Sequence, residues 1–452
     1  MRDFEIYEEM LDNKQYNALR NELTDENPAD ISGLIENIPV DKAVLIFRML
    51  PKDMEAEVFA NLFPDVQEAL IGKLSETEIR SIIEELFLDD AADFIEEMPA
   101  GIAKKVLATA KPETREEINR LLKYPEDSAG SIMTVEYVDL KSEMTVREAF
   151  SRIRRTGTDK ETIYTCFVVD SERRLVGVVS AKTLMLAERD EIIGDIMDDV
   201  NLVTAETLED REVVAQRVNK YDLLSIPVVD SEKRLVGIIT IDDIADVVEE
   251  EATEDFEKMA AMLPSEKPYL KTSVFELFKN RIGWLVGLMI MGMGTGVILK
   301  VYEDVLLAVP LLIGFVPMLT DTGGNAGSQS ATLIIRGMAV SEISSSDFLK
   351  AAWKEIRISL MAGVVLAVVA FLRVILFYHT ETELFLKASV ISITIIFTVF
   401  MAKLCGVALP ILAKKLNIDP AIMAAPLITT IVDTCSLVVF VMIAKLLLGH
   451  LM

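Results

Sequence analysis

Apolar side chains recur at helical spacing through residues 1–125, in short pieces that prolines and acidic residues interrupt. "DKAVLIFRMLP", "DMEAEVFANLFP" and "DVQEALIGKLS" each place apolar residues three or four positions apart, which is the spacing of one face of an α-helix. Acidic residues at the starts suit the positive end of the helix dipole, and prolines suit the breaks. The pattern predicts a stack of short helices, an all-α helical-repeat domain.

An internal repeat with a strand pattern follows within residues 126–250. "VVDSERRLVGVVSAKTL" at 168–184 recurs as "VVDSEKRLVGIITIDDI" at 228–244. In each copy, two β-branched runs joined by a turn precede a helical pattern. Two copies in register predict a pair of small α+β modules. The acidic stretch "DVVEEEATEDFEKM" at 246–259 then predicts a connecting helix before a proline-containing linker.

The remaining chain contains five long apolar segments, each long enough to cross a bilayer. They lie at about 282–300, 305–333, 358–378, 386–413 and 421–448. Basic and acidic loops alternate between them, which predicts a cytoplasmic N-terminus and an external C-terminus because Lys and Arg favour the cytoplasmic side. The predicted domains are a helical domain at 1–125, the paired modules at 126–250, a connecting helix and linker at 251–275, and a transmembrane domain at 276–452.

Charge divides the chain in the same way as hydropathy does. The 452 residues carry a formal net charge of -27. Residues 271–452 hold 14 basic and 11 acidic side chains, which leaves 31 basic and 61 acidic side chains for residues 1–270. So acidic a surface excludes nucleic acid as a partner and favours a cation. The first residues are too acidic for a signal peptide, so we expect the soluble part to be cytoplasmic.

Asp433 lies near the middle of the last apolar segment. A carboxylate at that depth costs about 2.5–3.5 kcal/mol on insertion scales. No basic residue of the same segment is placed to neutralise it. Pro426 loosens the preceding turn and frees carbonyl groups that can face a cation, and Thr429 and Thr430 follow it. We interpret Asp433 as an ion-pathway carboxylate, although a buried structural aspartate is the alternative.

The second apolar segment ends in the polar stretch "TDTGGNAGSQSATLIIRG" at 320–337. It lacks the lysine and the order of a phosphate-binding loop. Its glycines permit close helix packing, which is the simpler explanation. Asn325, Ser328, Gln329 and Thr332 share much of one helical face. A polar face on one span and a lone aspartate on another predict a water-filled path between them.

The repeat resembles a tandem CBS pair, a module that often binds adenosine nucleotides. Together with the helical domain, the acidic connecting helix and five spans, it resembles the MgtE family of magnesium channels and transporters. "GGNAGSQSATLIIRG" and "PLITTIVD" look like that family's membrane signatures. The resemblance implies a multidomain membrane protein: an all-α cytosolic helical-repeat domain, an α+β tandem CBS pair and a five-helix transmembrane domain. It also implies a lipid-embedded homodimer of a bacterial inner membrane, with Mg²⁺ as its ion.

The resemblance further implies site residues. The pore metal residues would be Asp433, Asn325, Thr429 and Gln329. Regulatory Mg²⁺ would bind carboxylates of the helical domain, the CBS pair and the connecting helix, at Asp89, Asp93, Asp210, Glu212, Asp222, Asp243, Asp246, Glu251, Glu254 and Asp255. At low Mg²⁺ these carboxylates would repel one another, and at high Mg²⁺ the ions would bridge them and close the pore. A solvated acidic face is the simpler interpretation of these acids.

The resemblance to a CBS pair also implies a nucleotide site. ATP would bind the second CBS copy at Thr240 and Asp243, whereas the first copy has Ser180 but no acid at 182 or 183.

Three other functions remain to be compared with a magnesium channel. A proton-coupled carrier of broader metal selectivity (Mn²⁺ or Co²⁺), regulated by nucleotide, stays open as an alternative. An anion channel would need basic groups at mid-membrane depth. An enzyme would need a nucleophile–base pair or a metal triad, which the sequence does not suggest, so we expect no catalytic activity.

Overall fold

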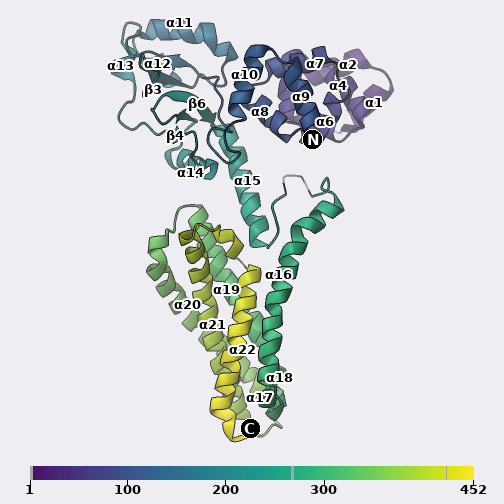
Figure 1. The fold of residues 1–452 in the computed structure, drawn as a ribbon, viewed down its shortest axis with the longest axis vertical. Coiled ribbons are helices and arrows are strands. Elements are labelled where there is room, and N and C mark those ends of the chain that lie inside the picture. Colours follow the sequence, from purple (N-terminus) through teal and green to yellow (C-terminus); the bar gives the residue numbers. More distant parts are fainter. Residues whose placement is uncertain (1–3, 266–268, 424, 452) are drawn as a thin grey trace. The chain divides into compact units, whose positions relative to one another are not determined.

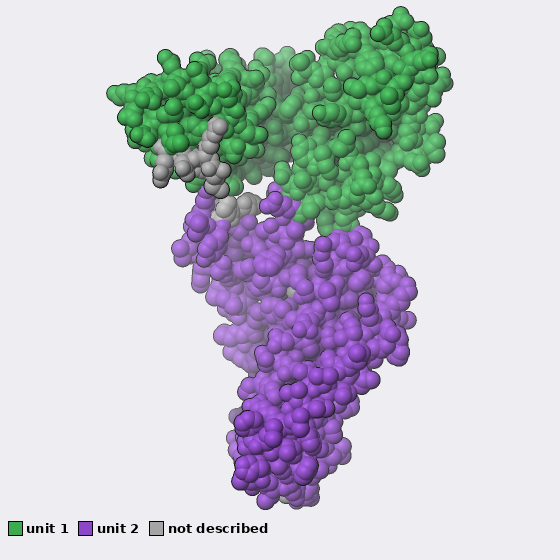
Figure 2. Space-filling view, turned by 180° about the vertical axis from the view of Figure 1, so that it is seen from behind, with its two compact units in different colours: residues 1–248 green, residues 249–452 purple. Residues whose placement is uncertain are grey.

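The computed structural model describes residues 4–265, 269–423 and 425–451 (Figure 1). The chain forms two units, residues 1–248 and residues 249–452, which Figure 2 colours separately. Each unit has hydrophobic cores of its own. The boundary between the two units lies within a single acidic helix, α15 (Ile241–Met259).

Unit 1 begins with short helices, as the apolar periodicity predicts. They are α1 Phe4–Asp12, α2 Tyr16–Thr24, α3 Pro28–Glu36, α4 Val40–Phe47, α5 Lys52–Ala60, α6 Pro64–Ile71, α7 Glu76–Glu85, α8 Leu88–Glu97, α9 Ala100–Thr109 and α10 Pro112–Leu121. Helices α3, α6 and α10 carry a proline in the first turn, where its missing N–H is no loss. Ser75 and Glu78 form a reciprocal capping box at the start of α7. Prolines and polar caps therefore set where these helices begin.

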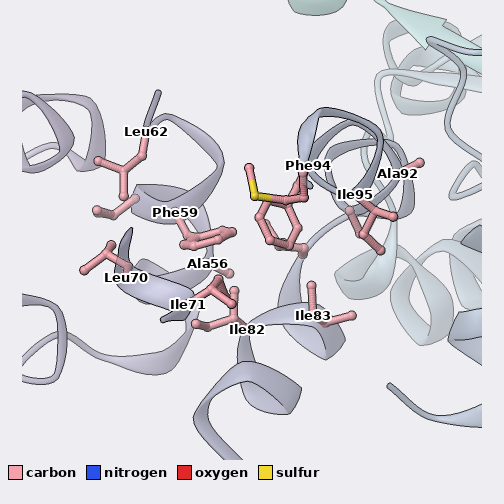
Figure 3. Packing of buried hydrophobic residues seen from close by; sticks show 14 of the residues in the cluster. Ala56, Phe59, Leu62, Leu70, Ile71, Ile82, Ile83, Ala92, Phe94 and Ile95 are labelled. Atoms are coloured by element: carbon pink, nitrogen blue, oxygen red, sulfur yellow. The ribbon is translucent and has the colours of Figure 1, made fainter. Parts of the chain in front are cut away.

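Apolar side chains of successive helices meet in one core (Figure 3). Phe59 of α5 and Phe94 of α8 pack edge to face, with ring centroids 4.9 Å apart, an arrangement that the charge distribution of aromatic rings favours. The same core continues into the second copy of the internal repeat through Ala205, Val214 and Ile226. This shared core fixes α8 relative to that copy.

The internal repeat forms two three-stranded sheets of identical topology. The strands are β1 Asp139–Leu140, β2 Thr165–Val169 and β3 Leu175–Ser180 in the first sheet, and β4 Ala205–Glu206, β5 Ser225–Val229 and β6 Leu235–Thr240 in the second. In each sheet the first strand pairs in parallel with the second, and the second pairs antiparallel with the third. The associated helices are α11 Val146–Thr156, η1 Gly157–Asp159, α12 Ala181–Leu186, α13 Ile193–Ile196 and α14 Arg211–Tyr221.

The two copies also repeat their local turn chemistry. Asp170 holds the β2–β3 turn by accepting hydrogen bonds from two backbone N–H groups, and Asp230 does the same in the β5–β6 turn. Across the copies, the backbone N–H of Leu175 donates to the carbonyl of Lys233 at 3.2 Å. The predicted pair of α+β modules is confirmed, and its two halves are bonded to each other.

Unit 2 is helical. Its helices are α16 Val274–Val301, α17 Glu303–Ala308, α18 Pro310–Ile313, α19 Val316–Ala339, η2 Ser345–Asp347, α20 Phe348–Phe377, α21 Leu384–Lys415, η3 Pro420–Met423, α22 Ala425–Leu448 and η4 Gly449–Leu451. Helix α21 packs against α19, α20 and α22, and α19 also packs against α22. In the described residues, four stretches are long and apolar enough to cross a membrane: 274–301, 345–377, 384–415 and 420–448.

The second predicted span, at about 305–333, differs from the structure. The chain there forms three separate helices, α17, α18 and α19. Pro310 and Pro317 lie in the first turns of α18 and α19, and each lacks the N–H that a continuous helix would use. Helix α19 also carries the polar stretch, so it is not among the four apolar candidates. The apolar helices fit a membrane domain, and the count of five spans stays a prediction.

Candidate functional site

The first turn of α8 begins a group of carboxylates. Asp89 keeps only 6% of its surface exposed, and it accepts a hydrogen bond from the backbone N–H of Asp90 at 3.1 Å. Glu136, distant in sequence, caps the helix by accepting a hydrogen bond from the backbone N–H of Leu88 at 3.0 Å. The positive end of the helix dipole favours negative charge here. Three carboxylates therefore meet at one helix start.

Two further segments add carboxylates to this group. The backbone N–H of Glu161 donates to the carbonyl of Glu136 at 2.9 Å, and Glu161 Oε2 is buried without a hydrogen-bond partner in the described structure. In the first turn of α15, Asp243 accepts a 2.7 Å hydrogen bond from the Thr240 hydroxyl. The charges of these side chains act on one another. The acidic cluster comprises Asp89, Asp90, Glu136, Glu161, Asp242 and Asp243.

Burial and mutual repulsion raise the pKa values in the acidic cluster. Burial, with the added charge of Asp242, raises the pKa values of Asp90 and Asp243 to about 6, against the lowering effect of the Thr240 hydrogen bond on Asp243. Burial and the charge of Asp243 raise the pKa of Glu161 to about 8. The same two causes move the pKa of Asp89 well above its usual range. The negative charge is thus poorly compensated by the protein, which favours a cation ligand.

The ligand atoms of the acidic cluster suit a hard divalent cation. Carboxylate oxygens are the ligands that Mg²⁺ prefers, usually together with several retained waters. The unpaired buried oxygen of Glu161 is the kind of atom that a bound ion or water satisfies. Within the described residues, no three His, Cys, Asp or Glu side chains are close enough to hold a metal directly. A cation would therefore reach these carboxylates through its waters or after small side-chain shifts.

Four of the predicted regulatory carboxylates lie in or beside the acidic cluster. Asp89 and Asp243 belong to it. Asp93 is exposed at its edge, and reduced solvation together with the charge of Asp90 raises its pKa. The charge of Asp246 acts on Asp90. The structure therefore gathers these four residues around one centre.

Glu212 lies elsewhere, in the first turn of α14, and Asp210 and Asp222 cap the two ends of that helix. Asp210 caps this helix by accepting hydrogen bonds from the backbone N–H groups of Glu212 and Val213, at 2.9 and 3.4 Å. Asp222 ends the same helix in the left-handed region, with φ of 50°. A helix of 11 residues is about 16 Å long. Asp210 and Asp222 therefore cannot bind the same ion within one chain.

Glu251, Glu254 and Asp255 lie on the part of α15 that belongs to unit 2. There Lys258 forms ion pairs with Glu254 and, at 2.7 Å, with Asp419. Burial and the charge of Asp419 raise the pKa of Asp255. The ten predicted regulatory carboxylates are thus distributed over three places.

The predicted nucleotide residues differ between the two copies of the repeat. In the second copy, the hydroxyl of Thr240 and the carboxylate of Asp243 are hydrogen-bonded to each other. In the first copy, the Ser180 hydroxyl accepts a hydrogen bond from the backbone N–H of Thr183 at 3.0 Å and caps α12. The hydroxyl and the acid are therefore adjacent in the second copy alone, where Asp243 also belongs to the acidic cluster.

Helix α19 buries a face of small residues. Gly323, Gly324 and Gly327 are buried. A Cβ atom on any of them would lie 2.7 or 2.8 Å from a side chain of α21 or α22, closer than real contacts allow. The glycines of the polar stretch therefore permit the close helix packing that their pattern predicts.

The other face of α19 is polar and exposed. Asp321, Asn325, Gln329 and Thr332 are all exposed, at the spacing of one helical face. Ser328 is half-buried, and its hydroxyl donates to the carbonyl of Gly324 in its own helix at 2.8 Å. Amide and carboxylate groups at membrane depth need water or protein partners. At membrane depth, this face would therefore need water or other polar groups beside it.

Asp433 lies half-buried on α22, which packs against α19. Thr429 precedes it by one turn on the same face, and its hydroxyl donates to the carbonyl of Pro426 at 2.9 Å. Asp321 of α19 is close enough for its charge to act on Asp433. No basic side chain of the described residues pairs with Asp433. The four predicted pore residues thus lie on two helices that contact each other.

Sequence reasoning missed several members of the acidic cluster. Asp242 is adjacent to the predicted Asp243, so the acidic run "IDDIADV" could have identified it, whereas Asp90 lies in the acidic run "LDDAADF" that the sequence already indicates. Glu136 and Glu161 lie outside helices and strands, with no local pattern that marks them. Their place depends on backbone contacts between segments distant in sequence.

Models of known protein families match three parts of the chain. Residues 316–443 match the MgtE family model, described as a divalent cation transporter. Residues 26–127 match the MgtE intracellular N domain. Residues 129–190 and 193–250 each match the CBS domain.

Two curated relatives are similar to this chain over almost their whole length. The magnesium transporter MgtE of Thermus thermophilus is 38% identical over 445 residues, which cover 98% of this chain and 97% of the relative. The magnesium transporter MgtE of Bacillus subtilis is 31% identical over 425 residues, covering 94% of this chain and 93% of the relative.

Solved structures match the soluble part. A crystal structure of the cytosolic domain of the Mg²⁺ channel MgtE in complex with ATP has a TM-score of 0.51 and 38% identity, and the match covers 53% of this chain and 98% of that one. A crystal structure of the soluble part of a magnesium transporter has a TM-score of 0.52 and 29% identity, with coverage of 55% and 98%.

Proposed function

The chain belongs to the MgtE family of magnesium transporters, a transport family rather than a family of enzymes, and we propose that it is a magnesium-selective channel. Its pore would lie at the interface of a homodimer. Cytosolic Mg²⁺ bound in unit 1 would close it. The observation that carries this proposal is the exposed polar face of α19 beside Asp433 of α22.

The exposed face of α19 supports a path formed by two subunits. In hydrocarbon, Asn325 and Gln329 would lack hydrogen-bond partners, which is costly. A second copy facing this surface would enclose the amides together with one Asp433 from each subunit. Two carboxylates and a ring of amide, hydroxyl and carbonyl oxygens attract a divalent cation without a competing basic group.

The chemistry of this path suits hydrated Mg²⁺. The ion prefers oxygen ligands in octahedral geometry and loses its waters reluctantly. Asp433, Asn325, Thr429 and Gln329 supply oxygen ligands that can bind the ion through its waters. Selectivity then depends on the width of the path and on the strength of its field, while weak binding lets the ion leave.

The acidic cluster supports closure by cytosolic Mg²⁺. Its carboxylates come from the helical domain, the CBS pair and the first turn of α15, so a bound cation would hold these three segments together. Without Mg²⁺, repulsion among Asp89, Asp243 and Glu161 would loosen them. A ligand that favours the bridged arrangement shifts the population toward it. Helix α15 continues into unit 2 and would carry this change to the membrane helices.

The alternation of basic and acidic loops supports a cytoplasmic N-terminus, and we place the five proposed spans in a bacterial inner membrane, as the family resemblance implies. In this orientation the acidic unit 1 is exposed to cytosolic Mg²⁺. Closure of the pore by that ion would let the channel respond to the cytosolic Mg²⁺ concentration, which its own transport raises.

Flux through liposomes containing the full chain tests the pore assignment. Asp433→Asn should lower Mg²⁺ flux at least about tenfold, because the lost charge interaction is worth a few kcal/mol at a protein-like dielectric. Asp304→Asn, an exposed residue of α17, is the matched control and should leave the flux unchanged. Full flux in Asp433→Asn would show that the path runs elsewhere.

The same liposomes test closure and coupling. Raising Mg²⁺ on the cytosolic side should stop flux in the unmodified protein, whereas a triple variant, Asp89→Asn, Asp246→Asn and Glu254→Gln, should stay open. Closure of the triple variant at the usual Mg²⁺ concentration would argue against these carboxylates. An imposed pH gradient should not drive Mg²⁺ flux through a channel. Mg²⁺ flux driven by the pH gradient would instead identify the proton-coupled carrier.

We also propose that the second CBS copy binds ATP. The solved cytosolic domain that resembles unit 1 contains ATP, and Thr240 and Asp243 provide an adjacent hydroxyl and carboxylate. Calorimetric titration of the full chain with ATP should give one site per chain, and Thr240→Val should weaken it. Ser180→Val should have no effect, and equal weakening by both variants would contradict the assignment to the second copy.

A further inference from the structure

Three buried polar side chains bond to one another between the helices of unit 2, away from the exposed face of α19. The hydroxyl of Ser330 on α19 donates to Glu355 Oε2 on α20 at 2.6 Å. Lys403 Nζ on α21 donates to the same carboxylate oxygen at 3.2 Å and to the Ser330 hydroxyl at 3.1 Å. All three residues are buried. We call them the buried triad.

The buried triad is chemically unlike the ion path. Glu355 and Lys403 form an ion pair, so the triad carries no net charge and does not attract a cation. Charged groups at this depth are costly unless they are paired and hydrogen-bonded. Each member of the triad meets that requirement through the other two. Its role therefore concerns the three helices that it joins.

The triad depends on a close approach of α19 and α21. A Cβ atom on Gly406 of α21 would lie only 2.5 Å from the carbonyl oxygen of Gly327 and 2.9 Å from the Cβ of Ser330. Gly406 follows Lys403 by about one turn on the same face. The glycine contact sets the distance between the helices, and the triad adds directional hydrogen bonds at the same level.

Those hydrogen bonds also define how α19 is rotated about its own axis. Successive residues of an α-helix lie about 100° apart. A rotation of α19 by one residue would move Ser330 away from Glu355, and it would turn Asn325 and Gln329 away from their present direction by the same angle. Apolar packing alone is less directional than hydrogen bonds to a fixed ion pair.

We propose that Ser330, Glu355 and Lys403 are positioning residues, which hold α19 in the rotation that presents Asn325 and Gln329 to the ion path. This inference rests on the proposed function, because it assumes that water reaches the exposed face of α19. The triad touches no ion itself. It acts through the orientation of the helix that carries the amides.

A thiol-accessibility measurement on the full chain in liposomes tests this role. The native cysteines Cys166, Cys405 and Cys435 are first replaced. A single cysteine is then placed either at Thr332, on the exposed face, or at Ile334, which is buried. A charged, membrane-impermeant thiol reagent reports which position faces water. The ratio of the two modification rates, measured on protein shown to be folded, reports the rotation of α19.

In the otherwise unchanged protein, Thr332→Cys should react at least about tenfold faster than Ile334→Cys. Ser330→Ala should reduce this ratio severalfold, and Glu355→Gln should reduce it further, in keeping with the usual coupling of contacting residues. The double variant Glu355→Gln with Lys403→Gln removes both charges and keeps hydrogen-bonding groups, so it should recover most of the ratio. Mg²⁺ flux should fall and recover in the same order.

Ser359→Ala is the matched control. Ser359 is buried on α20, one turn from Glu355, and its hydroxyl donates to the carbonyl of Ile356 in its own helix at 2.8 Å. This variant should leave the ratio unchanged. An unchanged ratio in Ser330→Ala and in Glu355→Gln, where both proteins fold, would overturn the positioning role. No modification of Thr332→Cys in the unchanged protein would instead refute the water path, and with it the premise of both proposals.

Discussion

The acidic cluster of unit 1 and the buried triad of unit 2 treat buried charge in opposite ways. In the triad, Lys403 neutralises Glu355, and Ser330 completes the hydrogen bonding. In the acidic cluster, no Lys or Arg of the described residues forms an ion pair with Asp89 or Glu161, and the carboxylates raise one another's pKa values. The charges of the buried triad therefore compensate each other, whereas basic side chains of the described residues leave the carboxylates of the acidic cluster poorly compensated.

The difference indicates what each charge is for. A charge that only has to hold helices together is stabilised by a partner from the same chain, because an unpaired buried charge is costly. A charge that must bind an external cation has to remain without such a partner. Asp433 resembles the acidic cluster in this respect, since no basic side chain of the described residues pairs with it. Unpaired carboxylates therefore mark both proposed Mg²⁺ sites.

Removing one charge should thus have opposite effects on stability in the two regions, and the larger effect should be in unit 2. Lys403→Met would leave Glu355 buried without its partner, which should lower the free energy of unfolding by about 3–5 kcal/mol. Detergent-induced unfolding of the full chain measures this loss. The double variant Lys403→Met with Glu355→Met should regain most of it. A single variant as stable as the original would show that the pair is not buried as described.

In the acidic cluster, removing one charge should instead stabilise the Mg²⁺-free protein. Asp90→Asn removes a charge that is disfavoured by burial and by Asp242, which raise the pKa of Asp90 to about 6; this corresponds to about 3 kcal/mol at neutral pH. Hydrogen exchange of α8 in the full chain without Mg²⁺ should slow accordingly.

Asp53→Asn, an exposed acid in the first turn of α5, is the control for Asp90→Asn and should change exchange of α8 little. Faster exchange in Asp90→Asn would contradict the account, because it would mean that the charge of Asp90 already has a stabilising partner in the absence of Mg²⁺.

The periodic parts of the fold could be predicted from the sequence, because helical spacing and in-register repeats are local signals. The helical domain and the CBS pair are examples. The span at 305–333 was predicted as one helix because its average hydropathy masks the two breaks, although Pro310 and Pro317 mark them. The polar face of α19 was predicted from spacing, and Ser328 is half-buried beside its exposed residues.

The sites were harder to predict than the elements, because they depend on contacts between distant segments. Glu136 and Glu161 join the acidic cluster through one backbone hydrogen bond and one helix cap, and no local pattern announces either. Lys403 is a lone basic residue in an apolar segment, so a buried partner could have been expected. That the partner is Glu355 follows only from the packing of α20 against α21.

The pH dependence of stability should sharpen the comparison further. The pKa values of Asp90 and Asp243 are raised to about 6, and that of Glu161 is raised to about 8. In the unfolded chain the same groups have pKa values near 4. At a pH between the two values of a group, the folded state therefore binds more protons than the unfolded state does. Stability without Mg²⁺ should therefore fall as pH rises from about 4 to 8, by about 1 kcal/mol per pH unit for each extra proton bound.

Saturating Mg²⁺ should offset this loss most strongly near pH 8, because protons no longer compete with the metal for the carboxylates. Hydrogen exchange of α8 and of the first turn of α15 measures both the loss of stability with rising pH and its offset by Mg²⁺. It is recorded at pH 5, 6.5 and 8, with and without Mg²⁺, and corrected for intrinsic exchange rates. A Mg²⁺ effect that is largest at pH 5 would be inconsistent with carboxylate ligands.

The smallest effect is expected at Asp210, which caps a helix and is also one of the predicted regulatory carboxylates. Its carboxylate caps α14, and asparagine caps a helix about as well as aspartate does, so Asp210→Asn should change stability by less than about 0.5 kcal/mol, whereas Asp210→Ala should cost about 1 kcal/mol. Asp210→Asn thus removes the charge and keeps the cap. We expect it to reduce the Mg²⁺ protection of α8 by less than Asp90→Asn does, because Asp210 lies outside the acidic cluster. An equal reduction would show that regulatory Mg²⁺ also binds at α14, as the family resemblance predicts.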